Sequence, residues 1–598
     1  MNKKSKVSGA ILYVSLLAFI LFTIYILYIN REVLYTAHDR SEFLYGSPFF
    51  NTLMSRPFGL MQYIGAWLTQ FFYHPALGTV ILAAIWVLIF FVGVRAFRLR
   101  GSASALMLLP VACLLTSVVD LGYWVYILPI RGYWFSQSLG FLVMLLLLWA
   151  ARCTPRRWHI AWYSLGFFLF AVLGWFAMLF VLCLMLVEKP SWRELLGIAV
   201  LLFTAGVWRS LLYSNQKFDD VLLAGFPRFI TPSDSSPRLS IPFWALGAVA
   251  VLIPLCSRLH WGKAHSPYSI FHLQFIPPLC TVAGIVFTLS LMFHDHNYID
   301  EMRMVRYASD GNWKAVLRMV EGDGKGVQAS SASRTGTMVF LKNVALMHEG
   351  GLLDRSFAMG NEVAGIYNPD SVHVSFLEIA APLAYYNYGM LNEGFRLSFE
   401  CAVQSGFSPA CLKMLTRCAH ANGEEQLAAR YIAQLHHHPF YTHWQPETVP
   451  ETVQELHHSY PDEITGVENS DGYIVNSISL WNVSDSKLAS EQALFYAMLR
   501  RDSRRFWASF RNFVKLHTGE AFPMHAAEAY ILYMDKAPEE KRVMIPVSED
   551  LYHRYNQFWE TLGALLQSGK SRDEVAGQMR SGYGDTYWYY NLFSRRVY

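Results

Sequence analysis

The carboxylates best placed for chemistry lie in a polar segment just after the first apolar stretch of the chain. The segment from Tyr35 to Glu42 reads Tyr-Thr-Ala-His-Asp-Arg-Ser-Glu and places Asp39 and Glu42 three residues apart. Such a carboxylate can act as a general base on a hydroxyl group, or hold a divalent cation against a phosphate leaving group. Asp39 and Glu42 are therefore the candidate catalytic residues, and a divalent cation is the one cofactor that this pattern suggests.

Basic residues near the two carboxylates could bind a phosphate. Arg40 lies between the carboxylates, and Arg56 follows in the same external segment. A guanidinium group binds phosphate in a bidentate manner, which makes these arginines candidate substrate ligands together with His38 and the more distant Arg131. The alternative is that these charges are solvated loop residues or partners in salt bridges.

The hydropathy of the chain changes once, near residue 295, and this change divides the protein into two halves. Residues 1–294 contain repeated apolar runs, whereas residues 295–598 show the pattern of short amphipathic helices. The mean hydropathy of +0.24 and the 16% of charged residues average over these halves. We therefore expect an all-α protein, with a transmembrane helix bundle over 1–294 and a soluble helical domain over 295–598.

The apolar runs are long enough to cross a bilayer, which takes about 20 residues. The expected spans are 8–29, 77–98, 103–121, 135–151, 193–212, 241–257 and 272–294. The stretch from Ile160 to Val187 allows two interpretations, because it is longer than one span needs and has Gly174 at its middle. As one helix it gives eight spans; as two half-length spans turning at Gly174 it gives nine.

Basic residues beside the spans predict the orientation, because Lys and Arg are enriched in cytoplasmic loops. This rule places the N-terminus and the loops after the second and fourth spans in the cytoplasm, and it places loop 30–76 outside. With nine spans residues 295–598 also lie outside, and with eight they lie inside; we favour nine. The basic residues on which the cytoplasmic loops depend are Lys3, Lys4, Lys6, Arg95, Arg98, Arg100, Arg152, Arg156 and Arg157, joined in the nine-span arrangement by Lys189, Arg193, Arg258 and Lys263.

The soluble half shows recurring helix pairs. Glycines at Gly389 and Gly423 are 34 residues apart, which is the period of the tetratricopeptide repeat, and each is followed five residues later by a small residue, Gly394 or Ala428. We expect a tetratricopeptide-like α-helical repeat domain over 295–598, which could bind a protein partner on its concave face. The other interpretation is an irregular helical domain. Residues 440–485 are expected to be a long connecting segment, and helices should resume near 489–518.

The arrangement of an acidic first external loop, many spans and a soluble helical tail resembles that of the polytopic glycosyltransferases with a fold of type C. In that family one or two acidic residues of the first external loop are catalytic, and Asp39 and Glu42 occupy the matching positions. The spacing of this pair departs from the adjacent or alternate acidic pair of the family. The resemblance implies transfer of a sugar from a polyprenyl-phosphate carrier at the periplasmic face.

A second resemblance covers nearly the whole chain. The segments Gly65–Pro75, Leu341–Phe357 and Ala428–Leu435 are similar to an uncharacterised polytopic inner-membrane family of Bacteroidetes-type bacteria. This resemblance implies the inner membrane of a Gram-negative bacterium and a domain of unknown function, and it supplies no catalytic residues.

Two classes of function follow from these patterns. One is a membrane glycosyltransferase acting on a polyprenyl-phosphate-linked sugar, and the alternative is a non-enzymatic scaffold whose repeats bind a protein. A transporter is disfavoured because few charged residues lie deep within the spans. Nucleic acid is not expected as a partner, because the net charge of +4 is small and the basic residues form no surface stripe.

Overall fold

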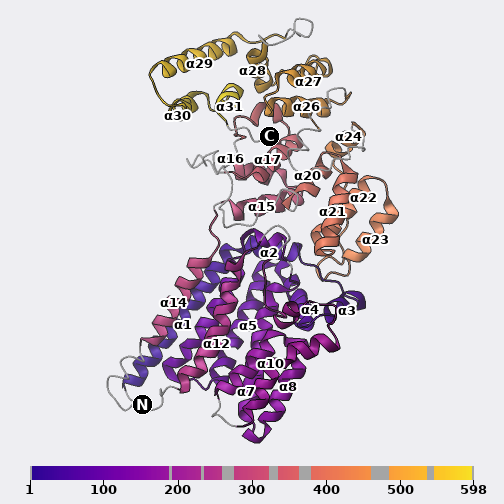
Figure 1. Cartoon of the computed structure of the whole chain (residues 1–598). Coiled ribbons are helices and arrows are strands. Elements are labelled where there is room, and N and C mark those ends of the chain that lie inside the picture. Colours follow the sequence, from indigo (N-terminus) through magenta and orange to yellow (C-terminus); the bar gives the residue numbers. More distant parts are fainter. Residues whose placement is uncertain are drawn as a thin grey trace.

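Helices are the regular elements of the part of the chain that the structure describes. The computed structural model describes residues 3–128, 130–187, 192–230, 235–258, 275–295, 297–321, 334–361, 379–459, 478, 484–534 and 545–594. Over these ranges the one β contact is an isolated bridge between Ile230 and Ser235. The all-α prediction is confirmed for these residues, and Figure 1 shows a helical body beneath a second group of helices.

Long apolar helices form the N-terminal body. Within the described ranges, six segments are long and apolar enough to cross a bilayer: Gly9–Ile29, Pro75–Ala96, Gly101–Val119, Tyr133–Cys153, Glu194–Leu211 and Pro237–Leu255. They belong to α1 (Lys3–Ile29), α5 (Pro75–Ala96), η2 (Gly101–Met107) with α6 (Leu108–Val119), α7 (Tyr133–Cys153), α10 (Glu194–Leu211), and η5 (Pro237–Ser240) with α12 (Ile241–Arg258). Even an 18-residue helix is about 27 Å long, close to the thickness of the hydrocarbon layer.

Three shorter apolar helices complete the body, and two of them divide the stretch from Ile160 to Val187. They are α8 (His159–Leu173), α9 (Trp175–Val187) and α14 (Ile276–Leu291). The break between α8 and α9 is at Gly174, where φ is +53° and a Cβ atom would lie 2.1 Å from the carbonyl oxygen of Ala224. A side chain does not fit there, so the two half-length helices are observed and the single long helix is wrong.

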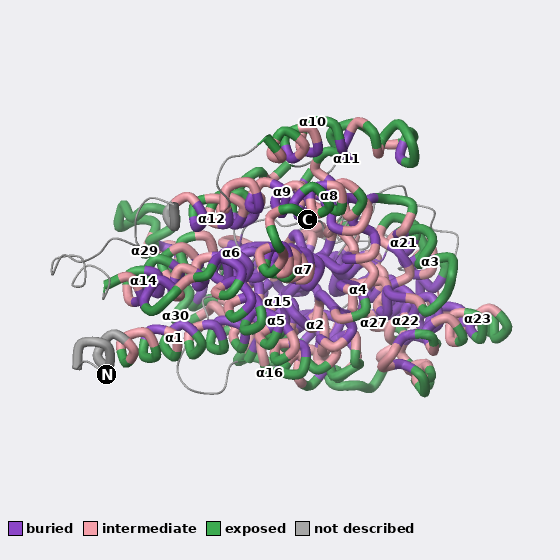
Figure 2. Tube along the Cα trace, turned by 90° about the horizontal axis from the view of Figure 1, so that it is seen from below, coloured by how far each residue is buried: buried purple, intermediate pink, exposed green. Residues whose placement is uncertain are grey.

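The body is buried along its centre and apolar at its surface. In Figure 2 the buried positions concentrate on the central helices α6 and α7, whereas α1 and α10 are largely exposed. In the most apolar 18-residue stretch of each segment, 83% of the residues are buried in Gly101–Val119 but only 22% in Glu194–Leu211. Exposed helix surface of this composition is stable against lipid rather than water.

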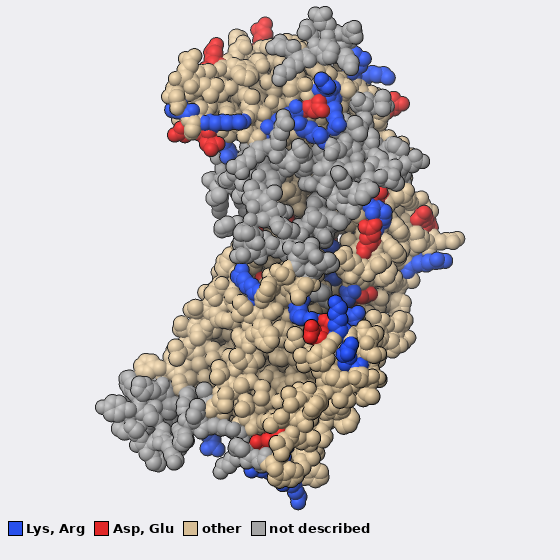
Figure 3. All heavy atoms as spheres, viewed as in Figure 1, with Lys and Arg blue, Asp and Glu red and all other residues tan. Residues whose placement is uncertain are grey.

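Arginines gather at the end of the body that lies farther from the C-terminal half. Arg98 donates to the carbonyl of Arg152, and Arg193 donates to the carbonyl of Arg156, which also pairs with Glu194. These contacts join the ends of α5, α7 and α10, and Figure 3 shows basic side chains at this lower end below a broad uncharged band. We call it the basic end. Lys189 and Lys263, expected on the same side, lie outside the described residues.

The other end of the body carries the segment between the first two long helices. It contains α2 (Arg31–Asp39), α3 (Ser47–Met54), α4 (Gly59–Thr69) and η1 (Gln70–Tyr73). Helix α4 crosses α7 closely at Gly65 and Gly132, since a Cβ atom on Gly65 would lie 2.5 Å from the Gly132 carbonyl oxygen. This close packing fixes the position of residues 30–76, which we call the polar loop, against the bundle. We call this the junction end, because the C-terminal half is docked on it.

The C-terminal half consists of short amphipathic helices that pack mainly on their neighbours in sequence. They are α15 (Tyr298–Ser309), α16 (Trp313–Glu321), α17 (Gly336–Glu349), α18 (Leu352–Arg355), α20 (Ala381–Asn387), α21 (Leu391–Ser405), α22 (Pro409–Ala421), α23 (Glu425–Leu435), α24 (Glu451–Ser459), α26 (Lys487–Leu499), α27 (Ser503–Leu516), α28 (Met524–Tyr533), α29 (Glu549–Gln567), α30 (Arg572–Tyr583) and α31 (Tyr587–Phe593). Helices α26 and α27 match the predicted resumption near 489–518. The predicted connecting segment 440–485 is corrected, because it contains α24; residues 460–477 and 479–483 lie outside the described part.

The close helix crossings expected of the repeat are present. A Cβ atom on Gly394 in α21 would lie 3.2 Å from both Cys418 Sγ and the Pro382 carbonyl oxygen, so a larger residue would press on them. Ala428 in α23 is buried. The pairs α20–α21 and α22–α23 therefore have the predicted turn and crossing. This feature is found in two successive pairs and does not by itself establish a repeat domain.

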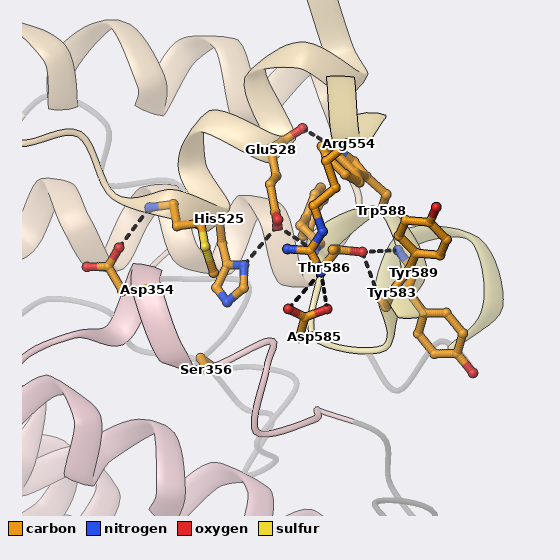
Figure 4. Close-up of polar contacts among 12 residues, drawn as sticks. Asp354, Ser356, His525, Glu528, Arg554, Tyr583, Asp585, Thr586, Trp588 and Tyr589 are labelled. Carbon is orange, nitrogen blue, oxygen red and sulfur yellow. Dashed lines mark hydrogen bonds and ion pairs between the residues drawn. The ribbon is translucent and has the colours of Figure 1, made fainter. Parts of the chain in front are cut away.

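A buried carboxylate fastens the last helix to the C-terminal half. Figure 4 shows Glu528 between His525 and the start of α31. Its Oε2 lies 2.9 Å from His525 Nδ1 and accepts a hydrogen bond of 2.7 Å from the backbone N–H of Tyr587. Trp588 Nε1 donates to the Glu528 carbonyl at 2.8 Å. The two hydrogen bonds from the start of α31 to Glu528 hold α31 on α28.

The crossing of α4 and α7 should be intolerant of a single added methyl group. A Cβ atom on Gly132 would lie 2.4 Å from the Ala66 nitrogen, at a φ of +63°. Gly101 has a similar φ of +58° but no atom within 4 Å of the same position. Gly101→Ala should therefore lose only about 1–2 kcal/mol from backbone strain, and Gly132→Ala should lose clearly more. Thermal unfolding of the full-length variants in detergent measures the difference, and equal losses would contradict the close crossing.

Candidate functional site

The residues of the polar loop are divided between two places at the junction end. His38, Asp39, Arg40 and Glu42 contact the C-terminal half, whereas Arg56 lines a separate cavity. Helix α2 follows α1 after only Asn30 and therefore projects from the body into the C-terminal half.

Asp39 forms a buried ion pair with Lys413 of α22, with 2.8 Å between Oδ1 and Nζ. Burial works to raise the pKa of Asp39, but the Lys413 ammonium group outweighs it and holds this pKa below its ordinary value. For Lys413, burial works to lower the pKa. The negative charge of Asp39 outweighs this effect, so that the pKa of Lys413 is raised. Each charge thus stabilises the other where little water reaches them.

His38 and Arg40 contact two further segments of the C-terminal half. His38 is fully buried, with Nε2 3.1 Å from the hydroxyl of Tyr441, and burial lowers its pKa to about 3. Arg40 donates to the carbonyl of Ile379 at 2.9 Å, and its guanidinium lies over the ring of Tyr126. Both side chains therefore take part in the contact between the two halves.

Glu42 links the C-terminal half to the body. Its Oε2 lies 3.2 Å from Arg131, and its Oε1 accepts a hydrogen bond of 3.1 Å from the backbone N–H of Phe407. Burial lowers the pKa of Arg131, an effect that Glu42 opposes and the nearby Arg56 charge strengthens. Asp39 and Glu42 thus both serve the contact between the two halves of the protein.

A small cavity of about 70 Å³ remains at this contact. Asp39, Arg40, Lys413 and Arg417 are among the residues that line it. It is small for a sugar or a lipid headgroup, since small-molecule sites usually have volumes of about 300–1,000 Å³.

A much larger cavity lies beside the body at the junction end, and we call it the Arg56 cavity. Its volume is about 730 Å³, within the range of small-molecule sites. Charged and amide side chains line it together with apolar ones: Ser55, Arg56, Pro57, Gln62, Ile130, Asn215, Gln216, Lys217, Asp220, Leu223, Ala224, Gly225, Phe226, Arg228 and Ile230. They come from the polar loop, the segment before α7, and the connection between α10 and α12.

The wall of the Arg56 cavity is fixed by backbone contacts of this connection. Gly225 has a φ of +81° and lies against the ring of Phe58, where a Cβ atom would come within 2.5 Å. Gln137 of α7 donates to the Gly225 carbonyl at 2.7 Å, and the Phe58 N–H donates to Ala171 at 2.9 Å. The loop, α7 and α8 therefore hold the cavity open from three sides.

Positive charge predominates in the Arg56 cavity. Arg56, Lys217 and Arg228 face the single carboxylate of Asp220 among the lining residues, and Asp220 forms an ion pair with Arg228. Arg56 and Lys217 form no ion pair with any described carboxylate. Two cations without a carboxylate partner, with the amide of Gln62 beside them, make a site for an anion such as a phosphate.

The residues present do not form a metal site on their own. No group of three His, Cys, Asp or Glu side chains that could hold a metal occurs in the described ranges. A divalent cation at Asp220 would need most of its oxygen ligands from the substrate. The chemistry that the site itself supplies is therefore charge stabilisation by cations and proton transfer by one carboxylate.

The sequence identified Arg56 but not the residues that the structure places beside it. Lys217 and Arg228 are visible in the sequence only as basic residues in a loop, and Asp220 belongs to the short helix α11 (Phe218–Leu222). The feature of the sequence that could have identified these three residues is their position between two spans, on the same side of the membrane as Arg56. That signal depends on the orientation of the bundle, which the sequence left open.

Comparison with known proteins gives one match. A family model described as "Family of unknown function (DUF6057)" matches residues 6–594, which include both halves of the chain. No curated protein and no solved structure matches.

Removal of the Asp39 carboxylate should destabilise the protein strongly, since it leaves the Lys413 charge buried and unpaired. We expect Asp39→Ala to cost about 3–5 kcal/mol near neutral pH. The matched control is Glu520→Ala, which removes the carboxylate of the exposed pair with Lys487 and should change little. Thermal unfolding of the purified full-length variants measures both.

The pH dependence of this loss follows from the two pKa shifts. The Asp39 pKa is lowered, so its contribution is present above its ordinary pKa and is lost as the pH falls through the lowered value. The Lys413 pKa is raised, so its contribution is present below its ordinary pKa and is lost as the pH rises through the raised value. The stability gap between wild type and Asp39→Ala should therefore close in strong acid. A gap that stays constant there would contradict the ion pair.

Proposed function

The chain belongs to this family of unknown function, and we propose that it acts at the outer face of a bacterial inner membrane, with the basic end in the cytoplasm. The passes of the chain through the body support this arrangement: α1, η2–α6, α8, α10 and α14 run toward the junction end, and α5, α7, α9 and α12 run back. This alternation supports the proposed nine crossings, which would place the N-terminus in the cytoplasm and the C-terminal half in the periplasm.

Charge and aromatic residues support the same orientation. The described side chains of the basic end include seven arginines, namely Arg95, Arg98, Arg100, Arg152, Arg156, Arg157 and Arg193. An excess of basic residues in short loops marks the cytoplasmic side. Exposed tryptophans lie near the basic end at Trp158 and Trp192, and near the junction end at Trp67 and Trp244. Tryptophan is enriched at both surfaces of a bilayer, so the two sets fit its two interfaces.

Fusions with reporter proteins test the orientation. Alkaline phosphatase fused after Tyr598 should be active, because the enzyme works only outside the cytoplasm, and green fluorescent protein at this position should be dark. Both reporters fused after Arg100 should give the opposite result. Cytoplasmic behaviour of the fusion after Tyr598 would contradict the nine-crossing arrangement.

We propose that the activity is transfer of a sugar from a polyprenyl-phosphate carrier, with the phosphate in the Arg56 cavity. The observation that carries this proposal is the pair of cations, Arg56 and Lys217, which have no carboxylate partner among the described residues and line a cavity at the boundary of the apolar body. A lipid-linked phosphate places its charge at this depth while its chain stays in the bilayer. In this proposal Asp39 and Glu42 hold the soluble half beside the cavity, and its repeat-like helix pairs present the acceptor.

Loss of the Arg56 and Lys217 cations should weaken phosphate binding strongly without unfolding the protein. Each charge-assisted hydrogen bond contributes about 1.5–3 kcal/mol, so Arg56→Ala with Lys217→Ala should weaken undecaprenyl phosphate binding by about 100-fold or more. The control is Arg100→Ala, at the opposite end of the body. Titration of the full-length protein in lipid nanodiscs, followed by native mass spectrometry, measures the affinity.

Two outcomes of this experiment would contradict the proposal. Equal binding by wild type and the double variant would mean that the phosphate does not bind in the Arg56 cavity. Normal function of the double variant in cells would favour the alternative of a non-enzymatic scaffold. The buried contacts of α2 with the C-terminal half are the observation that favours that alternative, because they hold the helix pairs in a fixed position.

A further inference from the structure

We infer that Asp220 is the catalytic base of the Arg56 cavity and accepts the proton of the acceptor hydroxyl group. This inference rests on the proposed function, since it assigns a residue to that reaction. It replaces the assignment of this role to Asp39 or Glu42.

Asp220 is the one carboxylate among the described residues that line the Arg56 cavity. Its side chain is 43% exposed, so that a substrate hydroxyl group can reach it. Asp220 also shares the cavity with Arg56 and Lys217, which places a proton acceptor and two phosphate ligands on the walls of one chamber. A base and a leaving-group site in one chamber are the minimum that sugar transfer requires.

Asp39 and Glu42 lack this access. Their side chains are only 18% and 13% exposed, and each is held by a cation from another segment. Glu42 accepts a further hydrogen bond from the Phe407 backbone. A general base must be able to approach the proton that it removes, and these two carboxylates are committed to the contact between the halves.

Arg228 explains how Asp220 becomes available. Asp220 and Arg228 form an ion pair in which both side chains are more than a third exposed, so the pair contributes little stability. A phosphate group entering beside Arg56 and Lys217 competes for Arg228, because guanidinium binds phosphate in a bidentate manner. Arg228 then turns to the phosphate, and Asp220 is released when the donor is in place.

The step balances as a displacement at the sugar. The acceptor oxygen forms a bond to the anomeric carbon while the bond from that carbon to the phosphate oxygen breaks. The phosphate oxygen keeps the bonding electron pair and leaves as polyprenyl phosphate, whose charge Arg56 and Lys217 stabilise. Asp220 takes the hydroxyl proton and later releases it to water.

The test replaces one of two adjacent aspartates. Asp220→Asn removes the proton acceptor at constant shape, and Asp219→Asn removes the same charge at the next residue, which is exposed and does not line the cavity. Full-length proteins in nanodiscs are titrated with undecaprenyl phosphate. They are then incubated with undecaprenyl-phosphate-linked, radiolabelled hexoses and pentoses, and release of the sugar to water or to added sugars is counted.

We expect Asp220→Asn to bind undecaprenyl phosphate at least as tightly as wild type, and to lose about 100-fold or more of the turnover. Asp219→Asn should retain both. Four results would overturn the inference: full turnover by Asp220→Asn, loss of binding by Asp220→Asn, equal losses in the two variants, or binding without turnover of any donor by wild type. Absence of binding by wild type would instead overturn the proposed function itself.

Discussion

The structure depends on one constraint, which is that backbone polar groups in a hydrocarbon layer must be satisfied within the protein. Helices meet this requirement residue by residue, and the body is therefore built of helices whose loops lie at its two ends. Charged side chains follow the loops, and Figure 3 shows an uncharged band between the two charged regions. On this face of the molecule the charged groups that could take part in chemistry therefore lie at the ends of the bundle.

The contact between the halves solves a related problem, because it buries charges where little water remains. Helix α2 brings Glu32, His38 and Asp39 into this contact, and Glu32 is met by Arg303 and Arg306 while Asp39 is met by Lys413. A buried charge without its partner costs several kcal/mol, so these pairs define one position of the C-terminal half. Glu42 connects this position to Arg131 of the body and to the backbone of Phe407, and Arg131 directly follows Ile130, which lines the Arg56 cavity.

Local patterns allowed much of the fold to be predicted, whereas the site depended on distant contacts. Apolar runs predicted the six long helices, and the 34-residue spacing of Gly389 and Gly423 predicted the close crossings at Gly394 and Ala428. The break at Gly174 remained one of two alternatives, because the Ala224 carbonyl that excludes a side chain comes from a distant segment. The partner of Asp39 was not predictable, since Lys413 lies 374 residues away and no pattern joins the two.

The charges of the Arg56 cavity are informative because they differ from the rest of the junction end. At the contact between the halves, Asp39 pairs with Lys413 and Glu42 pairs with Arg131, so that each pair has no net charge. In the cavity, three cations share one carboxylate, and the excess has no partner among the described residues. Arg56 and Lys217 are exposed, so water solvates them when no anion is present, and they offer two positive charges to an anion that enters the cavity. An anion that binds between these cations is stabilised by them. The connection that supplies Lys217 and Arg228 follows α10, which is the least buried of the six long described segments, so that this anion can arrive from the lipid side.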